Sequence, residues 1–406
     1  MRHEHHAHES LGPTRRAWYT GLVQRISSRP AHARRFRFGG QAALITSATA
    51  VLLALSSVFA AAALNGSRSS PSSRRHALAT VPAAAPLPPT SMATTTTVAT
   101  TTTTAPPPPP ADLTLAGCPP PPPPTGPPST PWHPTVLVPD SALPAPSPAP
   151  PRRASLAPVS GKGMWIWEFA ATDRGDPSAI VSAAQKAGLH QLWVRVADSK
   201  DGFYGADELA KLVPVAHRQG IDVIGWGFPY LYDPVGDANW TVQALDWSAG
   251  PDHLDGFSAD LEEASEGVDM TAQRVQVYLS LVRHDRPAAL VVATVYRPTD
   301  QQWLAYPYRA IAPYVDAFAA MVYWGCDQPV VAAQQALTRL GTLAPVHLIG
   351  QAYNMADEGG RTAAPSPAEI DAFLVAARQG GALGASFWSW QSIDNNEWSA
   401  MATYPW

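Results

Sequence analysis

Two carboxylates separated by a single residue are the strongest chemical signal in the sequence. The segment LDGFSADLE (residues 254–262) is expected to form a β-strand, in which alternate side chains share a face, so Ser258, Asp260 and Glu262 point to one side. A neighbouring Asp raises the proton affinity of Glu262, which suits that residue to general acid catalysis near neutral pH. An acidic cluster at a helix N-terminus is the alternative, because Glu263 and Glu266 follow directly.

A barrel of parallel strands is expected to position these carboxylates. Short apolar runs alternate with helix-compatible segments, as in βα units, and residues 161–406 approach the roughly 250 residues typical of a (β/α)8 TIM barrel. In such a barrel, the active site lies at the C-terminal ends of the strands. The predicted strands are 163–169, 189–196, 221–228, 254–262, 289–296, 315–324, 346–353 and 381–390, and the clearest helices are 177–187, 207–219, 269–283, 329–340 and 367–379.

The predicted strand ends carry aromatic, acidic and amide side chains. Sugar rings have apolar C–H faces that stack on aromatic rings, and their hydroxyls bind carboxylates and amides, so this composition favours a saccharide site. Trp165 and Trp193 are interpreted as core residues instead, while Trp388 is expected to contact a ligand. The candidate substrate-binding residues are Glu168, Trp226, Trp324, Gln351, Tyr353, Trp388 and Trp390.

The fourth run resembles the DGxDxDxE signature of glycoside hydrolase family 18, the chitinase-like enzymes. Ser258 departs from the signature, because the family has its middle Asp at that position. The sixth run ends MVYW and is similar to the family's MxYD, with Trp324 in place of the Asp. The matching residues are Asp255, Gly256, Asp260, Glu262, Met321 and Tyr323, and Trp388 falls where the family has a Trp that floors the −1 subsite.

The resemblance implies a substrate-assisted mechanism. Glu262 would protonate the glycosidic oxygen, Asp260 would orient the 2-acetamido group that attacks the anomeric carbon, and Tyr323 would hydrogen-bond that group. The expected function is therefore a glycosidase acting on a wall or environmental polysaccharide that contains N-acetylated sugars. The DxE pair also resembles the lysozyme-type muramidases of family 25. A non-catalytic carbohydrate-binding barrel is the alternative, favoured by Ser258 and Trp324, and a protein-interaction domain is a third possibility.

The part of the chain before the barrel predicts a membrane-anchored protein. Residues 1–38 form a basic, His-rich tail, and residues 39–64 form an uncharged run long enough to cross a bilayer. The positive-inside rule then places the tail in the cytoplasm and the barrel outside. A cleaved signal peptide, ending near Ala60 to Ala63, is the alternative that would give a secreted protein. Residues 65–160 are rich in Pro, Thr, Ser and Ala and predict a disordered linker.

Charge and motifs exclude several other classes of function. The net charge of −4 argues against a general nucleic-acid binder, because phosphate binding needs a concentrated basic surface. The barrel has neither a P-loop nor a GxGxxG, so no nucleotide cofactor is expected, and its histidines are isolated, so no metal is expected. Cys118 and Cys326 are either two unrelated thiols or a disulfide, and the sequence leaves both open.

Overall fold

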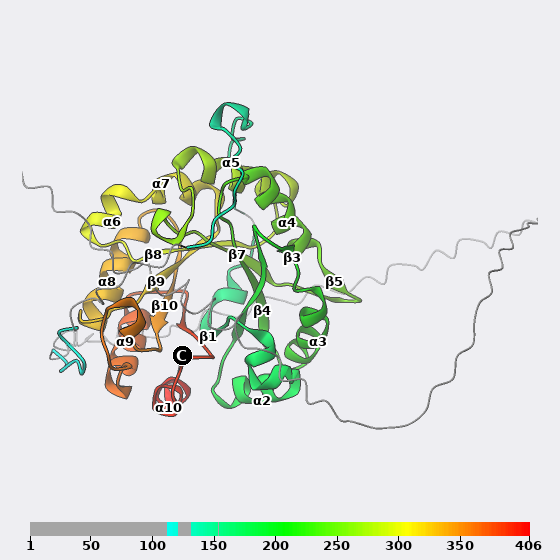
Figure 1. Cartoon of the computed structure of the whole chain (residues 1–406). Helices are drawn as coiled ribbons and strands as arrows, with labels where there is room; N and C mark the ends of the chain where they lie inside the picture. Colours follow the sequence, from blue (N-terminus) through cyan, green and yellow to red (C-terminus); the bar gives the residue numbers. More distant parts are fainter. Residues whose placement is uncertain (1–111, 121–130, 153) are drawn as a thin grey trace, which may run out of the picture. The chain divides into compact units, whose positions relative to one another are not determined.

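A closed barrel of eight parallel strands forms the centre of the computed structural model, which describes residues 112–120, 131–152 and 154–406. The strand order is β1-β11-β10-β9-β8-β7-β4-β2, and β1 also pairs with β2, which closes the ring. Figure 1 shows helices around these strands. The predicted TIM barrel is confirmed, and each predicted strand overlaps one of the eight. They are β1 (Gly161–Ile166), β2 (Gln191–Asp198), β4 (Asp222–Phe228), β7 (Gly256–Asp260), β8 (Val291–Tyr296), β9 (Ala317–Val322), β10 (Val346–Gln351) and β11 (Gly384–Trp388).

Five helices match the predicted ones to within about three residues at either end: α2 (Pro177–Lys186), α3 (Ala206–His217), α5 (Ala272–Asp285), α8 (Pro329–Leu340) and α9 (Pro367–Gln379). Local sequence explains this, since α2 and α9 each begin with Pro and have a capping side chain before it, Asp176 and Ser366. The other helices are α4 (Pro234–Asp246), α6 (Asp300–Ala305), α7 (Tyr308–Ile311) and α10 (Asn395–Thr403).

Short elements occupy the connections between strands and helices. Strand β3 (Gly202–Phe203) runs antiparallel to β2, and β5 (Ser248–Ala249) pairs with β6 (Asp252–His253) in a small hairpin. Two of the 3₁₀ turns, η6 and η8, follow the barrel strands β7 and β10 and carry residues of the pocket at the mouth of the barrel. The turns are η2 (Asp140–Ala142), η3 (Ala157–Val159), η4 (Phe169–Ala171), η5 (Asp173–Gly175), η6 (Ala264–Glu266), η7 (Ala312–Tyr314) and η8 (Ala356–Glu358).

The first described segment of the predicted linker, residues 112–120, is attached to the barrel. Cys118 and Cys326 form a disulfide, which decides between the two states that the sequence left open. Leu113 donates its N–H to the Gln328 side-chain oxygen at 2.9 Å and accepts from the Gln328 side-chain nitrogen at 3.0 Å.

The second described segment of the linker, residues 131–152, also packs on the barrel. The Val138 N–H donates to the Tyr232 carbonyl at 2.9 Å, and Arg152 donates to the carbonyls of Val315 and Ala312. The packed unit therefore begins before residue 161, where the composition had placed its start. A disulfide, side-chain hydrogen bonds and a few apolar contacts attach these segments to the barrel, and none of them follows from a hydrophobic periodicity.

The basic tail 1–38 and the predicted membrane run 39–64 lie outside the described residues. Among the residues that are described, no helix combines the length and the apolar character needed to cross a membrane.

Candidate active site

The paired carboxylates lie where β7 ends at the mouth of the barrel, which is the end formed by the strand C-termini. Asp260 is the last residue of β7, and Glu262 follows two residues later. Their relative exposures are only 3% and 4%. Both line the same pocket, so the predicted alternation along this segment brings them to one side.

Tyr296, the last residue of β8, holds Glu262 in place. Its phenol hydrogen-bonds the Glu262 carboxylate. Burial, together with the negative charges of Glu262 and Glu266, raises the pKa of Tyr296 well above its ordinary value, so the phenol stays protonated and donates. Tyr306 donates to the backbone carbonyl of Leu261 at 2.7 Å, which fixes the chain between the two carboxylates.

The pocket combines acidic, hydroxyl and apolar side chains from strand ends and from the loops that follow them. The structure brings together five of the predicted residues here: Asp260, Glu262, Tyr323, Tyr353 and Trp388. Tyr323 and Tyr353 meet edge to face, with their ring centroids 5.6 Å apart. The lining residues are Trp165, Asp260, Glu262, Glu266, Thr294, Tyr296, Met321, Tyr323, Ile349, Tyr353, Met355, Glu358 and Trp388.

A cluster of tryptophans fills the barrel beneath the carboxylates. Trp165 stacks on Trp193 with ring centroids 4.7 Å apart, and Trp388 lies 6.0 Å from Trp165. Trp193 is core, as expected, whereas Trp165 both packs in the core and lines the pocket. Trp388, 4% exposed, thus supplies an apolar floor to a pocket that also carries carboxylates.

The position below Asp260 carries a hydroxyl pair where family 18 has its middle Asp. The Ser258 hydroxyl lies 2.8 Å from the Thr294 hydroxyl, and Ser258 is fully buried. Since neither group ionises, this site adds no charge beneath Asp260. The departure that the sequence indicated therefore leaves a buried, uncharged hydroxyl pair next to Asp260.

Trp324 is not among the residues that line the pocket. Successive residues of a strand point to opposite sides, so Tyr323 faces the pocket and Trp324 faces outward, toward α9. The Trp324 indole donates to Glu369 at 3.0 Å and packs on Phe373, and the side chain is 2% exposed. Its indole N–H and its ring are thus both in contact with α9.

Trp226 and Gln351 are fully buried, and neither is among the residues that line the pocket. Trp226 extends the tryptophan cluster and donates its indole N–H to the Ile166 carbonyl at 3.2 Å. The Gln351 amide accepts from the Gly325 N–H at 2.8 Å and donates to the Tyr353 carbonyl at 2.9 Å. The second of these hydrogen bonds fixes the backbone of Tyr353, whose ring lines the pocket.

Glu168 and Trp390 follow β1 and β11, but neither is among the residues that line the pocket. The Trp390 ring packs on Trp398, with centroids 4.8 Å apart. The backbone N–H of Trp390 donates to the Trp165 carbonyl. The Glu168 carbonyl accepts from the Gln391 amide at 3.0 Å. Their contacts stabilise the loops beside the pocket.

Two carboxylates of the pocket were missed as site residues. Glu266 belongs to η6, after β7, and Glu358 belongs to η8, after β10. In the alternative interpretation Glu266 belongs to an acidic cluster at a helix N-terminus, but the structure places it in the pocket, where it is only 7% exposed. Because both come from irregular loops, no strand periodicity points to them.

A buried ion pair holds the loop that carries Tyr353, Met355 and Glu358. Arg361 donates to both oxygens of Glu369, one of them at 2.9 Å, and both side chains are fully buried. Burial alone would raise the pKa of Glu369, but the hydrogen bonds from Arg361 and Trp324 outweigh it and lower that pKa.

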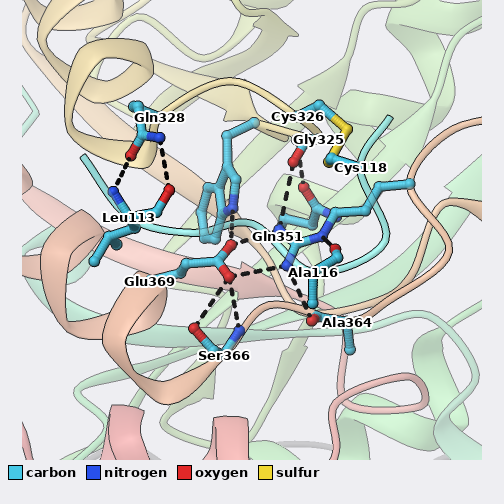
Figure 2. Close-up of polar contacts among 12 residues, drawn as sticks. Leu113, Ala116, Cys118, Gly325, Cys326, Gln328, Gln351, Ala364, Ser366 and Glu369 are labelled. Carbon is cyan, nitrogen blue, oxygen red and sulfur yellow. Dashed lines mark hydrogen bonds and ion pairs between the residues drawn. A yellow bond between two sulfur atoms is a disulfide. The ribbon is translucent and has the colours of Figure 1, made fainter. Parts of the chain in front are cut away.

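Segment 112–118 completes the support of this loop. Arg361 donates to the Ala116 carbonyl at 2.7 Å, and the Cys118–Cys326 disulfide lies beside that contact. Figure 2 shows Glu369 bonded to Ser366 on one side of this network and Gln328 bonded to Leu113 on the other. One wall of the pocket therefore rests on a segment more than 200 residues earlier in the chain.

No group of three His, Cys, Asp or Glu side chains is arranged to hold a metal ion within the described parts of the chain. The pocket instead offers carboxylates, phenols and aromatic faces, which suit proton transfer to a neutral polyhydroxyl ligand.

Several solved structures of sugar-related proteins are similar to the chain. A family 18 chitinase from Cycas revoluta is 11% identical, with a TM-score of 0.44, over 60% of this chain and 99% of that one. The spore cortex-lytic enzyme of Bacillus cereus is 11% identical, with a TM-score of 0.46, over 63% and 76%. A chitinase-like agglutinin from Robinia pseudoacacia is 15% identical, with a TM-score of 0.43, over 59% and 98%. No family model and no curated protein matches the sequence. With likenesses this low, activity has to be argued from the pocket.

Proposed function

We propose that the barrel is a glycoside hydrolase that cleaves a polysaccharide containing N-acetylated sugars. The observation that carries this proposal is the placement of Asp260 and Glu262, which both face a pocket floored by Trp388. Carboxylates provide the acid and the charge that glycosidic cleavage needs, and an apolar floor stacks against a sugar ring.

The proposed reaction uses the substrate's own acetamido group as the nucleophile. Glu262 donates its proton to the glycosidic oxygen as the bond to the anomeric carbon breaks, and the acetamido oxygen attacks that carbon. Asp260 orients the acetamido group, and Tyr323 hydrogen-bonds it. Water then opens the cyclic intermediate, while Glu262 takes back a proton. Tyr296, bonded to Glu262, keeps the acid directed toward the pocket.

We further propose that the enzyme acts outside the cell, attached to the membrane through residues 39–64, with 65–111 as the spacer. The Cys118–Cys326 disulfide supports this location, because disulfides persist in oxidising environments and are rare in the cytosol.

The test is hydrolysis of chitin oligosaccharides and of peptidoglycan glycan strands by the full-length chain in detergent. We expect cleavage at N-acetylated sugars, inhibition by a thiazoline analogue of N-acetylglucosamine, and no cleavage of chains that lack the N-acetyl group. Cleavage of the unacetylated chains at an equal rate would contradict the substrate-assisted reaction.

A non-catalytic sugar-binding barrel is the second candidate. The observation that favours it is the Ser258–Thr294 hydroxyl pair beneath Asp260, since that site lacks the charge of the family's middle Asp. Binding of the same oligosaccharides with no turnover would establish this second function instead.

A further inference from the structure

An exposed tryptophan lies on the loops beside the pocket. Trp132 belongs to the described segment 131–152, and 42% of its surface is exposed. Its ring meets the ring of Tyr230 edge to face, with centroids 4.8 Å apart. Tyr230 follows β4 and packs in turn on Phe228, at 4.7 Å. The rings of Trp132 and Tyr230 together form an aromatic platform.

The platform adjoins the loop that follows β7. A Cβ atom on Gly267 would lie 2.7 Å from the Trp132 carbonyl oxygen, so the Trp132 backbone touches the residue that follows Glu266, which lines the pocket. Tyr230 accepts a hydrogen bond at its carbonyl from the Asp269 N–H at 2.9 Å. The loop after β7 therefore connects the carboxylates to both platform residues.

The charges of Glu266 and Asp260, which both line the pocket, act on the Tyr230 phenol. Burial raises the pKa of Tyr230, and the negative charges of Asp198, Glu266 and Asp260 raise it further against the opposing effect of Arg195.

Buried polar contacts hold the platform in position. Arg274, 1% exposed, donates to the carbonyls of Leu231 and Tyr232 on one side and of Val138 on the other. The Leu231 N–H donates to Asp237 at 2.9 Å. One buried guanidinium thus joins the Tyr230 loop to the segment that carries Trp132. A ring that is fixed in place and still exposed loses little entropy when a ligand stacks on it.

We propose that Trp132 and Tyr230 form an outer subsite for a pyranose unit of the polysaccharide whose scissile bond lies at Asp260 and Glu262. This inference rests on the proposed function for the identity of the polysaccharide. The apolar face of a sugar ring stacks on an indole, and the neighbouring phenol offers a hydroxyl to the sugar's polar edge. The subsite lengthens the binding site and contributes to affinity for long chains, while cleavage remains in the pocket.

The experiment compares full-length wild type with Trp132→Ala on two substrates. One is an aryl glycoside of N-acetylglucosamine that fills only the pocket, and the other is a chitin hexasaccharide. We expect KM for the hexasaccharide to rise about tenfold, which corresponds to the loss of one stacking contact. The kinetics with the aryl glycoside should not change. Trp132→Phe, which keeps an aromatic face, should recover part of the affinity.

Val136→Ala is the matched control, because Val136 is exposed on the same segment and has no ring. The Val136→Ala variant should show wild-type kinetics with both substrates. An unchanged hexasaccharide KM in Trp132→Ala would overturn the subsite while leaving the proposed function intact, and equal losses on both substrates would assign Trp132 a merely structural role.

If wild type cleaves neither substrate, calorimetric measurement of hexasaccharide binding tests the subsite instead. Weaker binding by Trp132→Ala would then support the subsite although the proposed hydrolysis fails. Equal binding, or no binding by wild type, would overturn the subsite.

Discussion

The mouth and the base of the barrel each gather acidic side chains, but the two ends arrange them differently. At the mouth, Asp260 and Glu262 face a pocket. At the base, where the strands begin, His217 lies between two aspartates, with Nδ1 3.0 Å from Asp252 and Nε2 2.9 Å from Asp255. Asp255 also accepts the Val223 N–H at 2.7 Å.

The contrast teaches that acidic composition alone does not mark an active site. At the base, the carboxylates are satisfied by a histidine and a backbone amide, so the cluster ties the end of α3 to the strands beside it. At the mouth, aromatic walls and a tryptophan floor leave space in front of the carboxylates. We therefore expect changes at the mouth to affect catalysis and changes at the base to affect stability.

The largest expected effect is on turnover when Glu262 is changed to Gln. The amide is nearly isosteric but cannot donate the acidic proton, so kcat should fall by about 10²–10⁴-fold while the thermal unfolding midpoint stays close to wild type. Asp255→Asn at the base is the matched control and should keep wild-type kcat. Comparable turnover by wild type and Glu262→Gln would remove Glu262 from the mechanism.

The next largest effect is expected on stability, when the buried Arg361–Glu369 ion pair is broken. Arg361→Met leaves the Glu369 carboxylate buried without its guanidinium, which should lower the free energy of unfolding by about 3–5 kcal/mol in urea titrations. The double variant Arg361→Met with Glu369→Leu should recover much of this loss, because no charge then remains buried. Full stability of the single variant would contradict the role given to this pair.

A buried histidine in the barrel interior predicts a pH dependence of stability. His347 donates Nδ1–H to the Val159 carbonyl and accepts from the Ser386 hydroxyl at Nε2, and burial lowers its pKa to about 4. Because the unfolded chain binds this proton near pH 6.5, stability is lost as the pH falls from about 6.5 to about 4, by up to roughly 3 kcal/mol.

The measurement is unfolding free energy against pH for wild type and His347→Asn, which keeps a side-chain donor. The variant should be less stable at pH 7 and should have a flatter slope between pH 4 and 6.5. Identical slopes would mean that other groups cause the dependence.

The smallest effect, of opposite sign, is expected at the base. Burial lowers the pKa of His217, but its hydrogen bonds to Asp255 and Asp252 and their charges outweigh this and raise it. The stabilisation is therefore fully present below about pH 6.5 and is lost as the pH rises through the folded pKa. For such a partly exposed cluster it should be about 1 kcal/mol or less. His217→Gln should reduce the loss of stability above pH 6.5 without changing kcat, and a change in kcat would contradict the division between mouth and base.

Local periodicity was enough to predict the barrel and the central pair of carboxylates. The run at 254–262 places Asp260 and Glu262 on one side wherever it forms a strand, because alternation is a property of extended backbone. The same rule separates Tyr323, which lines the pocket, from Trp324, which packs on α9.

What the sequence determined by itself was the set of strands, most of the helices and the shared direction of Asp260 and Glu262, because each depends on residues close together in the chain. Only the tertiary structure decided that Glu266 and Glu358 join the pocket, that Cys118 bonds Cys326, and that Trp132 lies beside the loop after β7. These outcomes depend on contacts between distant segments, such as Leu113 with Gln328, 215 residues apart. In that contact Leu113 uses only its backbone groups, which every residue except proline carries, so the sequence of the segment does not reveal its partner.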